Sequence, residues 1–266
     1  MTTHFTRETQ DHIAIVTINT MTMPPLFFRE LREIFEQIAQ EDDLRAVILQ
    51  SKQKHFSYGL DLMAAFQEHG ALFAATGAKD RLALFGLIQK LQGHIEAVAS
   101  CPIPVIAAVQ GWCIGGGLDL ISACDIRLAT QDVKISLRET KIAIVADLGS
   151  LQRLQPIIGA GNLRELAFTG KDLNAQRAKE MGLINQVCDD KAALEAAALQ
   201  MAHEIAQNPP LTVRGVKQVL RFGADKSIEA GLAYVAAWNS AFLASEDLGE
   251  AVAAFSEKRP PRYEGK

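Results

Sequence analysis

The chain has 266 residues, of which 48% are hydrophobic and 22% are charged, and its formal net charge is -4. This composition is typical of a globular protein that is long enough to bury a large core. The negative charge argues against a protein that binds nucleic acid by neutralising phosphates, and no apolar run in the sequence is long enough to span a bilayer.

The first half of the chain alternates short β-branched segments with amphipathic helical patterns, which is typical of a layered α/β core. Pro25 opens the first helix, since proline is tolerated at a helix start, and Pro102 and Pro104 end a later one. We expect strands at 13–18, 46–49, 105–109, 126–129 and 134–136, and helices from Pro25, at 79–100 and at 116–123.

Helical patterns follow one another after Gly149. We expect helices at 151–158, 163–168, 175–181, 194–206, 211–222 and 227–243, with one strand at 184–187. Asn208-Pro209-Pro210 interrupts this series, because proline ends helices. We therefore predict an α/β core over residues 1–207 and a C-terminal helical region over residues 208–266.

The cysteines and histidines form no metal-binding pattern. Cys101, Cys113, Cys124 and Cys188 contain no C-x-x-C pair, and three of them lie among apolar residues, which favours buried free thiols. The histidines are scattered along the chain without an H-E-x-x-H motif. We predict that the protein has no metal site.

A glycine-rich turn, Gly111-Trp112-Cys113-Ile114-Gly115-Gly116-Gly117, follows the expected strand at 105–109 and opens a helix. A helix start offers free N–H groups and a positive dipole end, which suit an oxyanion or a phosphate. A dinucleotide-binding turn needs G-x-G-x-x-G with an acidic residue about twenty positions later, a spacing that three consecutive glycines do not match. The alternative is a tight turn whose glycines serve packing only.

A second turn, Phe56-Ser57-Tyr58-Gly59-Leu60-Asp61-Leu62, follows the expected strand at 46–49. Taken alone, it is a strand-to-helix turn in which Asp61 caps a short helix. Taken together, the two turns can each direct one backbone N–H toward a single oxygen.

The two turns, in this order and context, resemble the oxyanion-hole segments of the crotonase (enoyl-CoA hydratase/isomerase) family. The stretch from Pro102 to Gly111 and the ending Phe255-Ser256-Glu257-Lys258-Arg259-Pro260-Pro261 are similar to that family too. The resemblance implies a spiral ββα core with a C-terminal helical trimerisation region. It also implies that the backbone N–H groups of Leu60 and Gly116 form the oxyanion hole.

Within this family, residues 115–159 are most similar to the delta-3,5-delta-2,4-dienoyl-CoA isomerases. That subgroup has acidic residues at the positions of Asp119, Glu139 and Asp147, whereas typical hydratases have Glu, Glu and Gly there. The resemblance implies that Asp147 is the base at C2, that Glu139 is the acid at C6, and that Asp119 orients Glu139 or shares its proton. From the sequence alone, Asp147 could equally be an N-cap, although its neighbours from Ile142 to Ala146 are apolar and should raise its pKa.

The resemblance also indicates where coenzyme A and the substrate bind. The expected contacts are Ser57, Tyr58, Gly59, Asp61, Gly115, Lys54, Phe255 and Lys258. One departure concerns the segment 19–25, which has no basic residue where many relatives carry one. We expect no separate cofactor, because coenzyme A is part of the substrate.

Three functions remain open at this point. The first is isomerisation of 3,5-dienoyl-CoA to 2,4-dienoyl-CoA, the second is hydration or another isomerisation of enoyl-CoA, and the third is non-catalytic binding of acyl-CoA or RNA. The net negative charge and the three acidic residues argue against the third. We further expect a homotrimer or a dimer of trimers and, since neither end shows a targeting pattern, a cytoplasmic protein without membrane or nucleic-acid partners.

Overall fold

The computed structural model describes residues 3–74 and 76–266. Its centre is a six-stranded sheet in the order β1-β2-β3-β4-β6-β9. The strands are β1 (Phe5–Gln10), β2 (Ile13–Ile18), β3 (Ala46–Ser51), β4 (Val105–Val109), β6 (Ile126–Thr130) and β9 (Gln186–Cys188). Only β1 is antiparallel to its neighbour, and the other strands run parallel.

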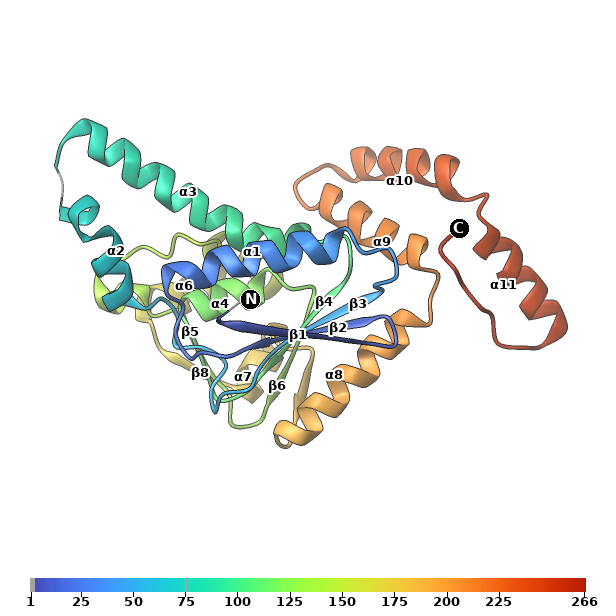
Figure 1. Cartoon of the computed structure of the whole chain (residues 1–266), viewed down its shortest axis with the longest axis horizontal. Coiled ribbons are helices and arrows are strands. Elements are labelled where there is room, and N and C mark those ends of the chain that lie inside the picture. The colour runs from blue at the N-terminus through green and yellow to red at the C-terminus, as the bar shows by residue number, and fades with distance from the viewer. Residues whose placement is uncertain (1–2, 75) are drawn as a thin grey trace.

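Residues of the parallel strands alternate between two apolar layers. Val105, Ala107 and Val109 of β4 belong to the main core, whereas Ile106 and Ala108 belong to a second cluster. Helices α1 (Pro25–Ala39) and α3 (Ala78–Ser100) contribute to the first layer, and α8 (Lys191–Ala206) covers the second (Figure 1). Every residue of β4 is buried, as expected for a parallel strand that is covered on both faces.

A smaller sheet in the order β5-β7-β8 lies beside the first. Its strands are β5 (Trp112–Ile114), β7 (Lys134–Ser136) and β8 (Asp172–Asn174). The short elements around it are α4 (Gly116–Ser122), a 3₁₀ helix (Glu139–Ile142), α5 (Ser150–Ile158), α6 (Ala160–Thr169) and α7 (Ala175–Glu180). These elements place the glycine-rich turn between the two sheets.

The two ends of the molecule are helical (Figure 1). At one end, α2 (Leu62–Ala74) and the first half of α3 project from the body. At the other end lie α9 (Pro210–Gly223), α10 (Ile228–Phe242) and α11 (Glu246–Glu257). The described residues include no helix that is long and apolar enough to cross a membrane, and no group of His, Cys, Asp or Glu that could hold a metal ion.

All of the expected strands are present, but five elements were not predicted, and the 3₁₀ helix at Glu139–Ile142 is one of them. Strand β1 is polar and mostly exposed, so it shows no apolar alternation. Strands β5 and β8 have three residues each, which is too short for a pattern to develop. Helix α11 did have a signal, since Ser245 caps it and Glu246 and Asp247 occupy its first turn.

Candidate active site

Main-chain pairing brings the two glycine-containing turns side by side. The N–H of Ser57 donates to the carbonyl of Trp112 at 3.0 Å, and the N–H of Ile114 donates to the carbonyl of Ser57 at 3.0 Å. This parallel bridge joins the turn that follows β3 to strand β5 of the other sheet. The two segments therefore meet as the sequence predicts.

The amides of Leu60 and Gly116 lie next to one another at this junction. A Cβ built on Gly116 would be 3.6 Å from the nitrogen of Leu60, and one built on Gly59 would be 3.1 Å from the nitrogen of Gly116. Gly59 has φ +82, and a Cβ built on it would lie 2.7 Å from the carbonyl oxygen of Ile114. Only glycine therefore fits at this position. Within the described residues, neither the Leu60 nor the Gly116 N–H donates to a protein group. Both donors are free for a ligand.

A cavity of about 460 Å³ opens at these amides. It is lined by residues of both turns, by all three acidic residues and by several side chains from the segment 138–148. Its lining consists of Tyr58, Gly59, Leu60, Leu62, Ile114, Gly115, Gly116, Asp119, Arg138, Glu139, Lys141, Ile142, Ile144, Asp147 and Leu148. One cavity thus holds two free N–H donors and three carboxyl groups.

Asp119 is the most deeply buried of the three acids. It lies in the first turn of α4, and its Oδ1 accepts the N–H of Ser150 at 2.7 Å. Burial raises the pKa of Asp119 to about 6, although the hydrogen bond from Ser150 opposes that rise. Asp119 therefore holds the start of α5 in place, and its carboxyl group titrates closer to neutral pH than an ordinary aspartate does.

Glu139 begins the 3₁₀ helix and extends toward the glycine-rich turn. A Cβ on Gly115 would be 3.1 Å from Oε1 of Glu139, so the glycine makes room for the carboxyl group. The other oxygen, Oε2, is buried and has no hydrogen-bond partner among the described residues. Burial, and then the charges of Asp119 and Asp147, raise the pKa of Glu139 to about 7. Such a group can exchange a proton at physiological pH.

Asp147 faces the same cavity, and burial raises its pKa as well. Burial is the cause that the sequence predicts, although the preceding residues differ in their exposure: Ala146 is buried, whereas Ile144 is 40% and Val145 76% exposed. Asp147 does not cap α5, because Gly149 holds the capping position and Asp119 accepts the Ser150 N–H. The N-cap interpretation of Asp147 is therefore wrong.

The remaining expected contacts fall into two groups. Tyr58, Gly59 and Gly115 line the cavity, whereas Lys54, Ser57 and Asp61 do not. Ser57 is buried, and its hydroxyl accepts the N–H of Gly59 at 3.0 Å, so it shapes the turn. Asp61 precedes α2 and its Oδ1 accepts the N–H of Ala64 at 3.0 Å. The capping interpretation of Asp61 is therefore confirmed.

Phe255 and Lys258 lie at the end of α11, on the opposite side of the molecule from α2 (Figure 1). Phe255 is 87% exposed and neither residue lines the cavity. The neighbouring Arg259 is held by Glu250 at 2.5 Å and by Glu257 at 2.6 Å. Within one chain, the C-terminal segment does not reach the site.

Sequence reasoning missed several residues that line the cavity, including Arg138 and Lys141. The guanidinium of Arg138 lies 4.9 Å from the ring centroid of Trp112 and pairs with Asp172 at 2.5 Å. Its position directly before Glu139 was the available signal. The apolar residues Leu62, Ile142, Ile144 and Leu148 were missed because their segments come together only in the folded chain.

This fold and this cavity define a member of the enoyl-CoA hydratase/isomerase family. The model of that family matches residues 8–266, so the chain belongs to it. The mitochondrial Delta(3,5)-Delta(2,4)-dienoyl-CoA isomerase of Dictyostelium discoideum is 41% identical over 237 residues, which are 89% of this chain and 81% of that protein. The peroxisomal enzyme of the same name from Arabidopsis thaliana is 41% identical over 239 residues, or 89% of this chain and 86% of the relative.

A solved structure supports the same assignment. The enoyl-CoA hydratase of Bacillus anthracis is 31% identical and superposes with a TM-score of 0.89, covering 99% of this chain and 100% of that one. The expected family and the expected crotonase-type α/β fold with C-terminal helices are thus confirmed.

Proposed function

We propose that this protein is an enzyme that isomerises 3,5-dienoyl-CoA thioesters to 2,4-dienoyl-CoA thioesters. The observation that carries the proposal is the third carboxyl group, Asp147, which shares one cavity with Asp119, Glu139 and the free amides. The relatives from D. discoideum and A. thaliana bear the name of this activity.

The first step of the proposed reaction removes a proton from C2 of the thioester. Ionised Asp147 takes this proton, and negative charge moves to the thioester oxygen as an enolate forms. The N–H groups of Leu60 and Gly116 are free to donate to that oxygen. Loss of one such donor typically costs about 2.7–4 kcal/mol of transition-state stabilisation.

The second step returns a proton at C6, which shifts both double bonds toward the thioester. C2 and C6 are several bonds apart, so one carboxyl group cannot serve both positions. Glu139, whose pKa is raised to about 7, is the proposed donor. The negative charge of Asp119 contributes to that raised pKa, which gives Asp119 its proposed supporting role. No additional cofactor enters either step.

The test is direct. Purified protein is expected to convert a 3,5-dienoyl-CoA to its 2,4-isomer, which is followed through the absorbance of the new conjugated thioester. Crotonyl-CoA and RNA serve as comparison ligands in the same experiment. Efficient hydration of crotonyl-CoA without isomerisation of the diene would contradict the proposal and favour the second candidate.

That second candidate, a hydratase, rests on Asp119 and Glu139, which lie at the positions of the two acids in hydratases. The methylglutaconyl-CoA hydratase of Mus musculus is 33% identical over 239 residues, which are 88% of this chain and 73% of that protein. Binding of RNA that weakens as salt is added would instead favour the non-catalytic alternative. The isomerase of D. discoideum is named mitochondrial and that of A. thaliana peroxisomal. A cytoplasmic location for this chain stays a prediction.

The pH dependence of kcat/KM is expected to be bell-shaped. The rate should fall as the pH rises through about 7, because Glu139 then loses the proton that it must donate. It should also fall in acid, because Asp147 gains a proton and can no longer act as a base. The measurement is kcat/KM of the wild type and of the residual activity of Glu139→Gln, in which the alkaline limb should be absent. A rate that stays constant from about pH 6 to about pH 9 would contradict this assignment.

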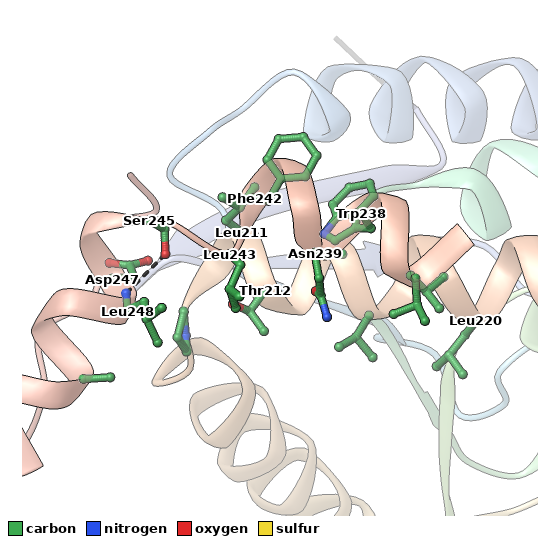
Figure 2. Close-up of a pocket in the computed structure, with 16 residues that line it drawn as sticks. Leu211, Thr212, Leu220, Trp238, Asn239, Phe242, Leu243, Ser245, Asp247 and Leu248 are labelled. Atoms are coloured by element: carbon green, nitrogen blue, oxygen red, sulfur yellow. Dashed lines mark hydrogen bonds between the residues drawn. The ribbon is translucent and has the colours of Figure 1, made fainter. Parts of the chain in front are cut away.

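We also propose that the chain assembles into trimers or dimers of trimers through its C-terminal helices. The structure describes every side chain of α10, and none of them is buried in the single chain. Apolar residues of α9, α10 and α11, among them Leu211, Leu220, Trp238, Phe242 and Leu248, line an open groove of about 300 Å³ (Figure 2). Light scattering at micromolar concentration is expected to give at least three times the mass of the chain. A monomer would contradict this expectation.

A further inference from the structure

The main chain at the proposed base is held by two side chains, one from helix α3 and one from helix α5, which follows the base. The side-chain amide of Gln92 donates through Nε2 to the carbonyl of Asp147 at 2.7 Å. The guanidinium of Arg153 donates through Nη1 to the carbonyl of Leu148 at 3.1 Å. Two consecutive peptide carbonyls, beginning at the base itself, are therefore fixed from outside their own segment.

Both of these contacts lead back to helix α3. Arg153 also donates through Nη2 to Glu96 at 2.7 Å. Gln92 and Glu96 are four residues apart on α3, a spacing that places them on one helix face. The second oxygen of Glu96 accepts from Arg221 of α9 at 2.9 Å. The Asp147 segment is thus tied to α3, which in turn is tied to the C-terminal helices.

Gly149 is shaped to accept this arrangement. Its φ of +119 lies in the region that favours glycine, and a Cβ there would be 2.0 Å from Nη1 of Arg153. The guanidinium therefore lies directly against the backbone two residues after the base. A side chain at position 149 would displace it.

Main-chain hydrogen bonds restrain the segment before the base as far as Ile144, whose N–H donates to the carbonyl of Glu139 at 3.0 Å, and among the described residues none holds 145–147. Ile142, Ile144 and Val145 are exposed, and Ala146 and Leu148 are the buried residues that flank Asp147. A carboxylate that must meet C2 within hydrogen-bond reach needs a fixed main chain, since a misplacement of about 1 Å can cost about 10²-fold in rate. The hydrogen bonds from Gln92 and Arg153 supply that restraint.

We propose that Gln92 and Arg153 are positioning residues that hold the carboxyl group of Asp147 against C2 of the bound thioester. This inference rests on the proposed role of Asp147 as the base. Neither residue lines the cavity, and each acts only through the main chain of residues 147–148. Their contribution should therefore vanish when Asp147 itself can no longer take a proton.

The test compares Gln92→Ala with Gln89→Ala, a matched change on the same helix at an exposed residue that makes no side-chain hydrogen bond within the described residues. Gln92→Ala is expected to lower kcat about tenfold and to leave KM within about twofold, whereas Gln89→Ala should change neither. Arg153→Lys, which keeps the positive charge, should fall between Arg153→Ala and the wild type. Thermal unfolding reports whether each variant is folded. If Arg153→Ala does not fold, the comparison of Gln92→Ala with Gln89→Ala is sufficient.

A double-mutant cycle decides between positioning and a general structural role. Added to Asp147→Asn, Gln92→Ala should cause no further loss, because its effect passes through the base. The same variants are assayed for exchange of the C2 hydrogens of butyryl-CoA with deuterium oxide. That reaction needs only the base and the oxyanion hole, so it tests the inference even if the wild type does not isomerise dienes. Equal rates in Gln92→Ala and Gln89→Ala, or an unchanged loss from Gln92→Ala in the Asp147→Asn background, would overturn the proposal.

Discussion

Gly116→Val is expected to abolish turnover of acyl-CoA thioesters while the protein stays folded. The ideal Cβ at this position lies 3.2 Å from Sδ of Met23 and 3.6 Å from the nitrogen of Leu60, so the added side chain would occupy the space between the two N–H donors. Removing a single oxyanion donor lowers kcat by about 10²–10³. Valine should cost at least as much, because it blocks access to both donors. The measurement is kcat with circular dichroism as the check on folding.

Two control variants distinguish loss of the oxyanion donors from the general effect of changing a side chain. Gly161→Val on α6 places the same side chain where nothing lies within 4 Å, so it should keep its activity. Leu60→Ala changes the side chain of the other donor residue but keeps its N–H, so it should alter substrate preference and not the oxyanion hole. Full activity in a folded Gly116→Val would favour the alternative in which the glycines serve packing only. It would also remove the main support for an enolate mechanism.

The second large effect is expected at the carboxyl groups. Asp147→Asn removes the proposed base and Glu139→Gln removes the proposed acid, and general acid–base groups typically contribute about 10²–10⁴-fold. Each variant should lose kcat by that order and should still bind the thioester, because the amides and the rest of the cavity are unchanged. The measurements are kcat with a 3,5-dienoyl-CoA and the dissociation constant of a saturated acyl-CoA.

Asp119→Asn should cause a smaller loss than either of these. An amide at position 119 can still accept the N–H of Ser150, so α5 keeps its anchor, whereas the charge that helps to raise the pKa of Glu139 is removed. Asp189→Asn, at an exposed carboxylate that is not part of the cavity lining, is the matched control and should behave as the wild type. Wild-type turnover in Asp147→Asn would show that the third carboxyl group is not the base.

The sequence predicts those features that depend on local pattern. The buried strand at 105–109 and the helix that Pro25 opens follow from apolar periodicity and proline chemistry, and both are present. The meeting of the two turns and the grouping of Asp119, Glu139 and Asp147 were expected from the resemblance to the crotonase family, whose motifs these segments match. Their chemical roles remain proposals.

Features that depend on contacts between distant residues could not be predicted. The hydrogen bond from Gln92 to Asp147 joins residues 55 positions apart, and no periodicity marks either partner. The apolar run before Asp147 indicated a buried segment, yet Ala146 alone of residues 142–146 is buried, and Ile142 and Ile144 are exposed side chains that line the cavity. Phe255 and Lys258 were expected to contact coenzyme A, yet within one chain neither residue lines the cavity.

The bridge between Ser57 and Cys113 has a consequence for how the protein becomes active during folding. The two proposed oxyanion donors belong to segments that follow strands of different sheets, so neither sheet alone contains the proposed hole. A refolding chain in which both sheets have formed but these segments have not docked would have native helix and strand content and no activity. Recovery of activity after dilution from denaturant would therefore report the docking of the two segments, which circular dichroism of the backbone does not register.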